Sequence, residues 1–300
     1  MKKIFKWIGI VIGSLIGLVL IAGFVFFLIG NGRLNKTYEF PPSNLTIPTD
    51  EASLAFGKHR VETLCTGCHG DDLGGKAFLD DPMIGSLNAV NITTGKGGIG
   101  DEFISDEDYV RAIRHGVDPE GKPIFMPAVN STSQLSDQDL ASIIAYLKTV
   151  PPVDNVIRGQ NFTPFAIIMN AVGVFPPLPV ETISHETHVT APARGVSVEY
   201  GDYLVSTNDC RDCHGVELAG AEYPDPTVKL ITPNLTPGGE LAFWSEADFI
   251  NALRTGVTPG GHHLKEIMPW EVYKKFTDDE LKAIYLYLTY LPEMDQIMPE

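Results

Sequence analysis

The pentapeptide Cys-x-x-Cys-His occurs twice, and it constrains this chain more than any other feature. One copy runs from Cys65 to His69 and the other from Cys210 to His214, and together they contain all four cysteines of the sequence. This pattern is the attachment signature of c-type haem. Each cysteine forms a thioether with a haem vinyl group, and the histidine lies beneath the iron. We therefore predict two covalently bound haem c groups, attached at Cys65, Cys68, Cys210 and Cys213.

Two other interpretations of Cys-x-x-Cys fit the sequence less well. A tetrahedral zinc site also uses such pairs, but it does not need a histidine directly after both of them. A thioredoxin-like redox motif is expected in a cytosolic βαβ context, and no such pattern surrounds either copy. We therefore assign His69 and His214 as iron ligands.

The second half of the chain repeats the first half. The two motif histidines lie 145 positions apart (214 minus 69). The segments Asn91-Ile-Thr93 and Met126-Pro127 return as Asn234-Leu-Thr236 and Met268-Pro269. A period of this length indicates a duplicated domain rather than a solenoid repeat. The predicted domains are residues 50–152 and 196–300, joined by a linker over residues 153–195.

Capping residues divide each half into short helices. Side chains able to cap a helix N-terminus occur at Asp50, Ser105, Ser136, Ser245 and Thr277. The expected helix ends lie at Gly116 and Gly256, and before Pro151 and Pro292. Little of the sequence alternates between apolar and polar residues as strands do, so we predict a mainly α fold.

A c-type haem iron needs a second ligand on its opposite face. Met126 and Met268 follow the two motifs at similar distances, and each precedes a proline that favours an extended backbone. We predict that both methionines bind iron, which closes it to substrates. Met83 is an alternative in the first half. His262 and His263 lie close to Met268 but are expected on the surface.

Other repeated and unrepeated residues give weaker signals. Arg114 and Arg254 recur before Gly-Val in the two halves. Each could bind a haem propionate, or could be a C-terminal arginine that the helix dipole stabilises. Four histidines recur in neither half and are expected to face solvent: His59, His115, His185 and His188.

The N-terminus has the pattern of a membrane anchor. Lys2, Lys3 and Lys6 precede an uncharged segment from Trp7 to Gly32 that is long enough to span a bilayer. We predict a signal anchor over residues 1–32 and a short linker over 33–49. The protein is expected to be single-pass in the cytoplasmic membrane, with both haem domains on the outer face. A cleaved signal peptide is the alternative.

The exported part is strongly acidic. Residues 51–150 carry eight Lys and Arg against fifteen Asp and Glu, a net charge of −7. Residues 196–300 carry seven against eighteen, a net charge of −11. Acidic surfaces attract basic proteins and disfavour nucleic acid.

The predicted linker contains an apolar segment of its own. Residues 161–180 have no charged side chain, but four prolines rule out a normal spanning helix. The segment could pack between the domains, lie on the membrane or bind a partner subunit. We favour the inter-domain position.

Several segments resemble a known family: residues 91–100, 105–117, 135–152 and 161–179. They are similar to the multihaem cytochrome c subunits of membrane-bound bacterial alcohol and aldehyde dehydrogenases. The resemblance implies two tandem cytochrome c domains behind the transmembrane helix, and electron transfer to quinone or a terminal acceptor. Those subunits usually have three haem sites, whereas this chain has two. Dihaem cytochromes of respiratory chains fit equally well.

We therefore expect an electron-transfer protein rather than an enzyme. It would take electrons from a membrane donor, either a quinol-oxidising complex or a dehydrogenase. It would pass them to an oxidase or a mono-haem cytochrome c. Two alternatives stay open: a subunit of an alcohol or aldehyde dehydrogenase complex, and a dihaem enzyme such as a peroxidase or thiosulfate dehydrogenase. A peroxidase needs an open iron, and a thiosulfate-type cysteine ligand would need a fifth cysteine.

Overall fold

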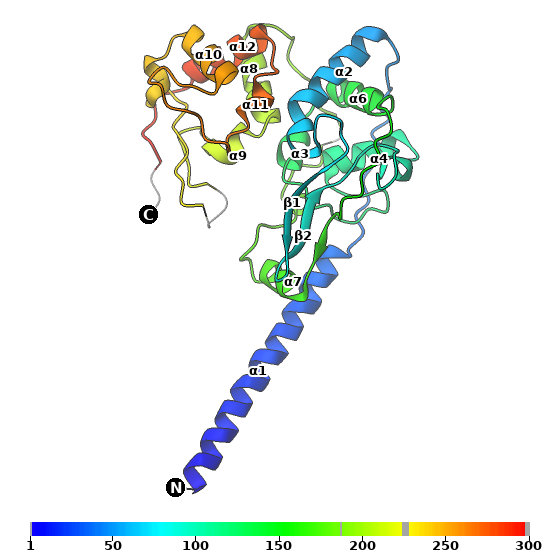
Figure 1. Cartoon of the computed structure of the whole chain (residues 1–300), viewed down its shortest axis with the longest axis vertical. Helices are drawn as coiled ribbons and strands as arrows, with labels where there is room; N and C mark the ends of the chain where they lie inside the picture. The colour runs from blue at the N-terminus through cyan, green and yellow to red at the C-terminus, as the bar shows by residue number, and fades with distance from the viewer. Residues whose placement is uncertain (1, 187, 224–227, 298–300) are drawn as a thin grey trace.

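The computed structural model describes residues 2–186, 188–223 and 228–297, so the predicted outer limits at Met1 and Glu300 lie outside it. A long N-terminal helix projects from one end of the first helical domain, and the second helical domain lies beside the first (Figure 1). The described chain is mainly helical, as the sequence predicts.

Helix α1 (Lys2–Leu34) has the length and composition of a membrane span. It is 33 residues long, with a mean hydropathy of 2.8 in its most apolar window. None of that window is buried against the rest of the protein. A signal sequence near the N-terminus has the same properties. The helix ends at Leu34, slightly beyond the predicted limit.

The segment that follows α1 lies along the first domain. The Glu107 carboxylate accepts hydrogen bonds from both the N–H and the hydroxyl of Ser43. Leu45 and Ile47 pack against the core of that domain. These residues therefore belong to the domain surface rather than to a free linker.

Helices α2 and α6 form the centre of the first domain. Its helices are α2 (Glu51–Leu64), α3 (Thr66–His69), η1 (Gly100–Glu102), α4 (Asp106–Val110), a π-helical turn η2 (Arg111–His115), α5 (Val129–Thr132) and α6 (Asp137–Leu147). Helices α2 and α6 cross at Gly57, where an added Cβ would lie 1.9 Å from the carbonyl oxygen of Ser142. The crossing therefore requires glycine.

The second domain has the same plan. Its helices are α8 (Val198–Thr207), α9 (Cys210–His214), η4 (Glu240–Phe243), α10 (Glu246–Thr255), α11 (Trp270–Tyr273) and α12 (Asp278–Tyr290). Helices α8 and α12 cross at Gly201, where an added Cβ would lie 2.0 Å from the carbonyl oxygen of Ala283. Leu204, Leu281 and Leu288 are buried in its core.

The predicted helix limits agree with the structure. Ser105, Ser245 and Thr277 each form a capping box with the acidic residue three positions later. Gly116 and Gly256 end their helices with φ angles of 68° and 71°, in the left-handed region that glycine favours. These signals are local, and so the sequence reveals them.

A small antiparallel sheet was not predicted. It contains β1 (Lys76–Asp81), β2 (Gly85–Ala89) and β3 (Asn161–Phe162), in the order β1-β2-β3. Much of β1 is exposed, so its sequence lacks the alternation of a half-buried strand. Strand β3 comes from the predicted linker, which is therefore partly a structured element of the first domain.

The apolar part of the linker does not lie between the domains, where we expected it. It forms α7 (Pro164–Ala171), which packs against the C-terminal end of α1. An added Cβ at Gly30 of α1 would lie 2.6 Å from the carbonyl oxygen of Ile167. A further turn, η3 (Pro179–Glu181), follows, and its Glu181 pairs with Arg33 at the end of α1.

Candidate haem sites

Both motif histidines are held in the same way. His69 Nδ1 lies 2.8 Å from the carbonyl oxygen of Val90, and His214 Nδ1 lies 2.8 Å from that of Pro233. A carbonyl can only accept, so Nδ1 carries the proton and Nε2 has a free lone pair. Burial lowers the pKa of both imidazoles, which favours this neutral form. The Nε2 atoms are therefore suited to bind iron.

The repeated Asn-x-Thr segment of the first domain fixes the carbonyl that holds His69. The side chain of Asn91 donates to Val153 O at 2.6 Å, and its oxygen accepts from the N–H and hydroxyl of Thr93 at 2.9 and 2.8 Å. Val90, which precedes Asn91, is held in place by these bonds. Asn91 is therefore an indirect support of the ligand geometry.

The second domain repeats this arrangement. Asn234 donates to Met294 O at 2.7 Å and accepts two bonds from Thr236, each at 2.8 Å. The preceding residue, Pro233, supplies the carbonyl for His214. The sequence showed that Asn-x-Thr recurs, but not that it supports the histidine, because the contact depends on the loop conformation.

The cysteines lie on or at the start of the short helices α3 and α9, which also carry the motif histidines. All four are free thiols in the structure. Burial raises the pKa of Cys65 and of Cys210 to about 12 in the folded chain. No group of three or more His, Cys, Asp or Glu residues suited to a metal ion occurs among the described residues. The surroundings thus fit a porphyrin-bound iron better than a zinc site.

The two candidate methionines occupy equivalent places. Met126 is half-buried in the loop before α5, where its carbonyl accepts from Val129 N at 3.0 Å. Met268 is half-buried in the loop before α11 and packs against the core of the second domain. Each thus lies two or three residues before the short helix that follows its Met-Pro pair.

The alternative ligands lie on the surface. Met83 is 60% exposed at the turn between β1 and β2. His262 and His263 are exposed, as predicted. These positions favour Met126 over Met83 in the first domain.

The repeated arginines bind the start of the last helix in each domain. Arg114 is fully buried, and its side chain pairs with Asp137 at 2.8 Å. Arg254 pairs with Asp278 at 2.7 Å. Asp137 and Asp278 are the first residues of α6 and α12. Both arginines also lie in the last turn of their own helices, η2 and α10, where the helix dipole favours a cation.

The prediction that four histidines face solvent was wrong for His115, His59 and His185. His115 is 1% exposed because Phe40, from the segment after α1, stacks on its ring at a centroid distance of 4.1 Å. Its Nδ1 lies 3.2 Å from Nδ1 of half-buried His185, and burial lowers the pKa of His115 to about 4. His59 pairs with the second domain, whereas His188 is exposed.

The second domain covers the first attachment motif. Lys275, just after α11, donates to the Thr66 hydroxyl at 3.0 Å and to Asp71 at 2.7 Å. An added Cβ at Gly67 would lie 3.0 Å from the side chain of Val272 in α11. Thr66 and Gly67 are the two variable residues of the motif, so α11 lies directly against it.

The first domain contacts the second motif in return. Ser131 of α5 accepts a hydrogen bond from Asp209 N at 3.1 Å, and Asn130 donates to Asp212 at 3.5 Å. Each domain thus places the short helix after its Met-Pro pair against the other domain's motif. This reciprocal contact brings the two attachment sites to one interface.

Asp209 is a distinctive residue of this interface. It has a φ of 58° and separates α8 from α9, whereas α2 continues directly to Cys65. Burial raises the pKa of its carboxyl group to about 6. The added residue therefore turns the second motif relative to its helix at the point where the two domains meet.

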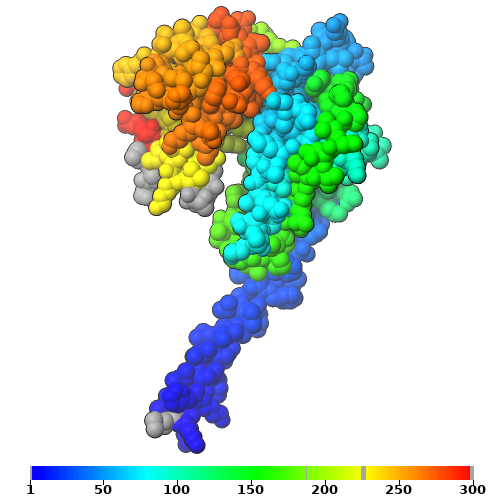
Figure 2. All heavy atoms as spheres, viewed as in Figure 1, coloured from blue at the N-terminus to red at the C-terminus, as the bar shows by residue number. Residues whose placement is uncertain are grey.

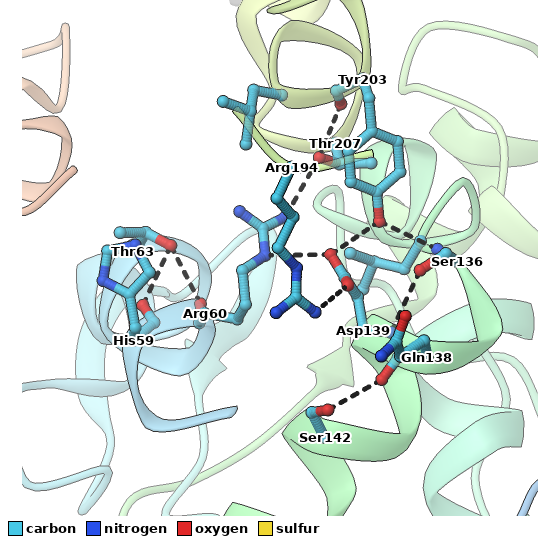
Figure 3. Close-up of polar contacts among 12 residues, drawn as sticks. His59, Arg60, Thr63, Ser136, Gln138, Asp139, Ser142, Arg194, Tyr203 and Thr207 are labelled. Atoms are coloured by element: carbon cyan, nitrogen blue, oxygen red, sulfur yellow. Dashed lines mark hydrogen bonds and ion pairs between the residues drawn. The ribbon is translucent and has the colours of Figure 1, made fainter. Parts of the chain in front are cut away.

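A buried polar network also joins the domains (Figure 3). The Asp139 carboxylate accepts from the Tyr203 hydroxyl at 2.9 Å and from Arg194 at 3.3 Å, and lies 3.7 Å from Arg60 Nε. Arg60 is 0% exposed and donates to the Thr207 hydroxyl at 3.1 Å. Arg194 thus brings a counter-charge to Asp139, and two hydroxyls of α8 form hydrogen bonds with Asp139 and Arg60 of the first domain.

Comparison with known proteins divides the chain into the same two halves. Residues 52–147 match the family described as cytochrome C oxidase, cbb3-type, subunit III. Residues 198–292 match the cytochrome c family. Each match includes one attachment motif, and neither includes α1.

Individual relatives agree with these matches. The cytochrome c subunit of a quinone alcohol dehydrogenase from Gluconacetobacter polyoxogenes is 28% identical over 259 residues, which cover 76% of this chain and 52% of the relative. This chain thus spans about half the length of that relative. A diheme cytochrome c-type protein from Cereibacter sphaeroides is 28% identical over 261 residues, covering 77% of this chain and 83% of the relative.

A shorter match shows the same domain in another dehydrogenase subunit. The cytochrome subunit of a fructose dehydrogenase from Gluconobacter japonicus is 31% identical over 106 residues, 33% of this chain and 22% of the relative. With two cytochrome c domains and an attachment motif in each, this chain is a dihaem c-type electron-transfer cytochrome that resembles the cytochrome subunits of alcohol dehydrogenases.

Proposed function

We propose that this protein carries electrons from a membrane donor to a terminal acceptor and has no substrate of its own. The reciprocal contact between each motif and the other domain's short helix is the observation that carries the proposal. It brings the two attachment sites together without a mobile linker between them. Each haem, when bound, supplies a one-electron iron couple.

We propose His69 with Met126, and His214 with Met268, as the iron ligands. The support is the free Nε2 of each histidine and the equivalent, half-buried positions of the two methionines. Methionine ligation raises the haem potential and leaves no open coordination site. That arrangement favours a carrier over a peroxidase.

We propose the domain limits 50–152 and 196–300, and a single membrane span in α1. The lysines at the start of α1 favour the cytoplasmic side, which places the haem domains outside. This placement agrees with the location at which c-type haem is attached. The redox donor would then be a quinol-oxidising complex or a dehydrogenase in the same membrane.

A second candidate function is a subunit of an alcohol or aldehyde dehydrogenase complex. It is favoured by the relatives, which are named as cytochrome subunits of alcohol and fructose dehydrogenases. A dehydrogenase that copurifies with the chain, in stoichiometric amount and after detergent extraction, would support this function. A chain that purifies alone but accepts electrons from quinol-oxidising membranes would support the carrier.

The acceptor side can be tested by stopped-flow reduction of a basic mono-haem cytochrome c. We expect the rate to fall as salt rises, because charges are screened over about 8 Å at physiological ionic strength. Replacing Glu271 and Asp279 of the more acidic second domain by lysine should slow the reaction. Exposed Asp101 and Glu102 of the first domain provide the matched control. Salt-independent rates, or rapid peroxide or thiosulfate turnover, would contradict the carrier function.

A further inference from the structure

The apolar segment after β3 presents an uncovered face beside the membrane helix. In α7, Ala166 and Ile167 are buried, and Ala171 lies next to Gly30 of α1. Helical geometry places Phe165 and Val172 on the opposite side, with Ile168 and Met169 between them. Phe165 and Val172 are 43% and 42% exposed. Helix α7 is thus apolar on both sides, although only one side is packed.

The uncovered face continues beyond the helix. Val174, in the turn after α7, is 61% exposed. On the other side, the Thr163 hydroxyl donates to the carbonyl of Met83, which is 60% exposed at the tip of the β1-β2 turn. We call Met83, Phe165, Val172 and Val174 the apolar rim. Isolated exposed apolar side chains are common, but several on neighbouring elements at one end of a domain indicate a contact surface.

The place at which α7 contacts α1 indicates that the apolar rim lies at the membrane surface. The uncharged part of α1, from Trp7 to Gly32, spans about 39 Å at 1.5 Å per residue. The hydrocarbon core of a bilayer is only about 30 Å thick. Helix α7 contacts Gly30, near the outer end of this segment, and so lies at the level of the outer lipid head groups. Figures 1 and 2 show α7 and the hairpin tip at the end of the first domain from which α1 emerges.

The few charged side chains near the apolar rim are compatible with a position among the lipid head groups. Residues 161–180 contain no charged side chain. In the hairpin tip, the Asp81 carboxylate accepts from the N–H groups of Met83 and Ile84, at 2.7 and 2.9 Å, and so is used within the turn. Asp80 pairs with Arg158.

We propose that the apolar rim inserts into the outer leaflet of the bilayer as a second membrane contact beside α1. The chain would then hold its first domain at a fixed orientation on the membrane, instead of on a freely pivoting helix. This inference rests on the proposed anchoring by α1. The expected ligand is the lipid surface itself, since interfacial helices bind through buried apolar area.

The test uses the full-length, haem-loaded protein in phospholipid nanodiscs. A cysteine is introduced singly at Val172 or Val174 and spin-labelled, since haem attachment consumes all four native cysteines. Power saturation then compares contact with dissolved oxygen, which enriches in lipid, and with a water-soluble nickel chelate. Ile104→Cys and Val216→Cys, at positions 92% and 75% exposed, are the matched controls.

We expect labels at Val172 and Val174 to be severalfold more accessible to oxygen than to nickel, and both controls to show the reverse. Labels at Val172 and Val174 that behave like the controls would overturn the proposal. Leu18→Cys, in the middle of α1, separates the two hypotheses. If this label lies in lipid and the α7 labels lie in water, α1 spans the membrane but the apolar rim does not insert into it. If α1 is absent from the mature chain, both fail.

Discussion

Each domain places a buried carboxylate at the same position of the interface, but different side chains pair with it in the two domains. Asp139 and Glu280 are both the third residue of the last helix, and they are 2% and 5% exposed. Asp139 binds Tyr203 of the second domain together with Arg60 and Arg194. Glu280 binds His59 of the first domain at 2.8 Å. Duplication has thus preserved the position of the contact while changing its chemistry.

The contact residues of the two domains are equivalent because they precede the residue inserted at Asp209, and so keep the same spacing along the chain. Gly57 and Gly201 both mark the crossing of a motif helix with the last helix, and they are 144 positions apart (201 minus 57). His59 and Tyr203 have the same separation. The motifs that follow are 145 apart, because one residue has been added before Cys210. The comparison teaches that two guanidinium groups pair with the carboxylate on one side of the interface, and a histidine pairs with it on the other.

The largest difference should appear when each carboxylate is removed. Asp139→Ala leaves Arg60 and Arg194 without their shared anion, and breaking a buried ion pair costs about 3–5 kcal/mol. We expect Glu280→Ala to cost less, because the groups it leaves are His59 and the N–H and hydroxyl of Thr277, and none of them is a buried guanidinium. Denaturant unfolding of the haem-loaded protein measures both, with exposed Asp101→Ala as the control. Equal costs would show that the two sides are energetically alike.

Substitutions at the two helix crossings should lower the unfolding free energy by similar amounts, unlike substitutions of the two carboxylates. In Gly57→Ala and Gly201→Ala the new methyl groups would meet carbonyl oxygens at 1.9 and 2.0 Å. Overpacking of this kind costs about 1–3 kcal/mol. We expect similar losses of unfolding free energy from the two variants. Gly260→Ala, where the nearest atom is 3.4 Å away, should be nearly neutral. A large loss in only one domain would indicate that its crossing can relax.

The Asn-x-Thr segments should each affect one haem. Asn91→Ala and Asn234→Ala remove buried hydrogen bonds, at a cost of about 1–3 kcal/mol each. We expect each variant to shift one of two midpoint potentials, because the supported carbonyl holds one histidine. Potentiometric titration checks this, and Asn251→Ala on an exposed helix surface is the control. Two shifted potentials in a single variant would mean that the domains are coupled more tightly than their contacts suggest.

The smallest effect should be the pH dependence of the Glu280 side. Burial alone would raise the pKa of Glu280, but its bonds to His59 and to the Thr277 cap outweigh burial and lower it below its ordinary 4.5. The stabilisation is therefore complete above that value and is lost as pH falls through the lowered pKa. In Glu280→Gln this part of the acid dependence, about 1 kcal/mol, should disappear. Acid unfolding curves of the two proteins, with exposed Glu240→Gln as control, measure it; parallel curves would contradict the assignment.

Local signals made the helices and the presence of two haem c groups predictable. Capping boxes such as that of Ser245, and the repeated Cys-x-x-Cys-His, depend only on neighbouring residues. Contacts between distant segments were not predictable in this way. His115 is buried by Phe40, and α7 is held by α1, because the fold brings together parts that no local pattern connects.

The repeat also concealed residues that only one copy has. The residue of the second domain that corresponds to Arg60 is Leu204. A comparison of the two halves therefore gives no reason to predict a structural role for Arg60. Yet it is among the largest fully buried side chains of the protein. Internal comparison identifies what both domains share, such as Asn91 and Asn234, and misses what makes their interface.

The reciprocal covering of the motifs favours an order of events during biogenesis. If the chain is exported as proposed, the first domain emerges before α11, and the first motif is not yet in contact with the second domain. Once the second domain closes, Lys275 and Val272 lie on the variable residues of that motif. Because these two variable residues lie under the second domain while Cys68 stays exposed, we expect haem attachment at the first motif to be faster on a chain whose domains have not yet joined.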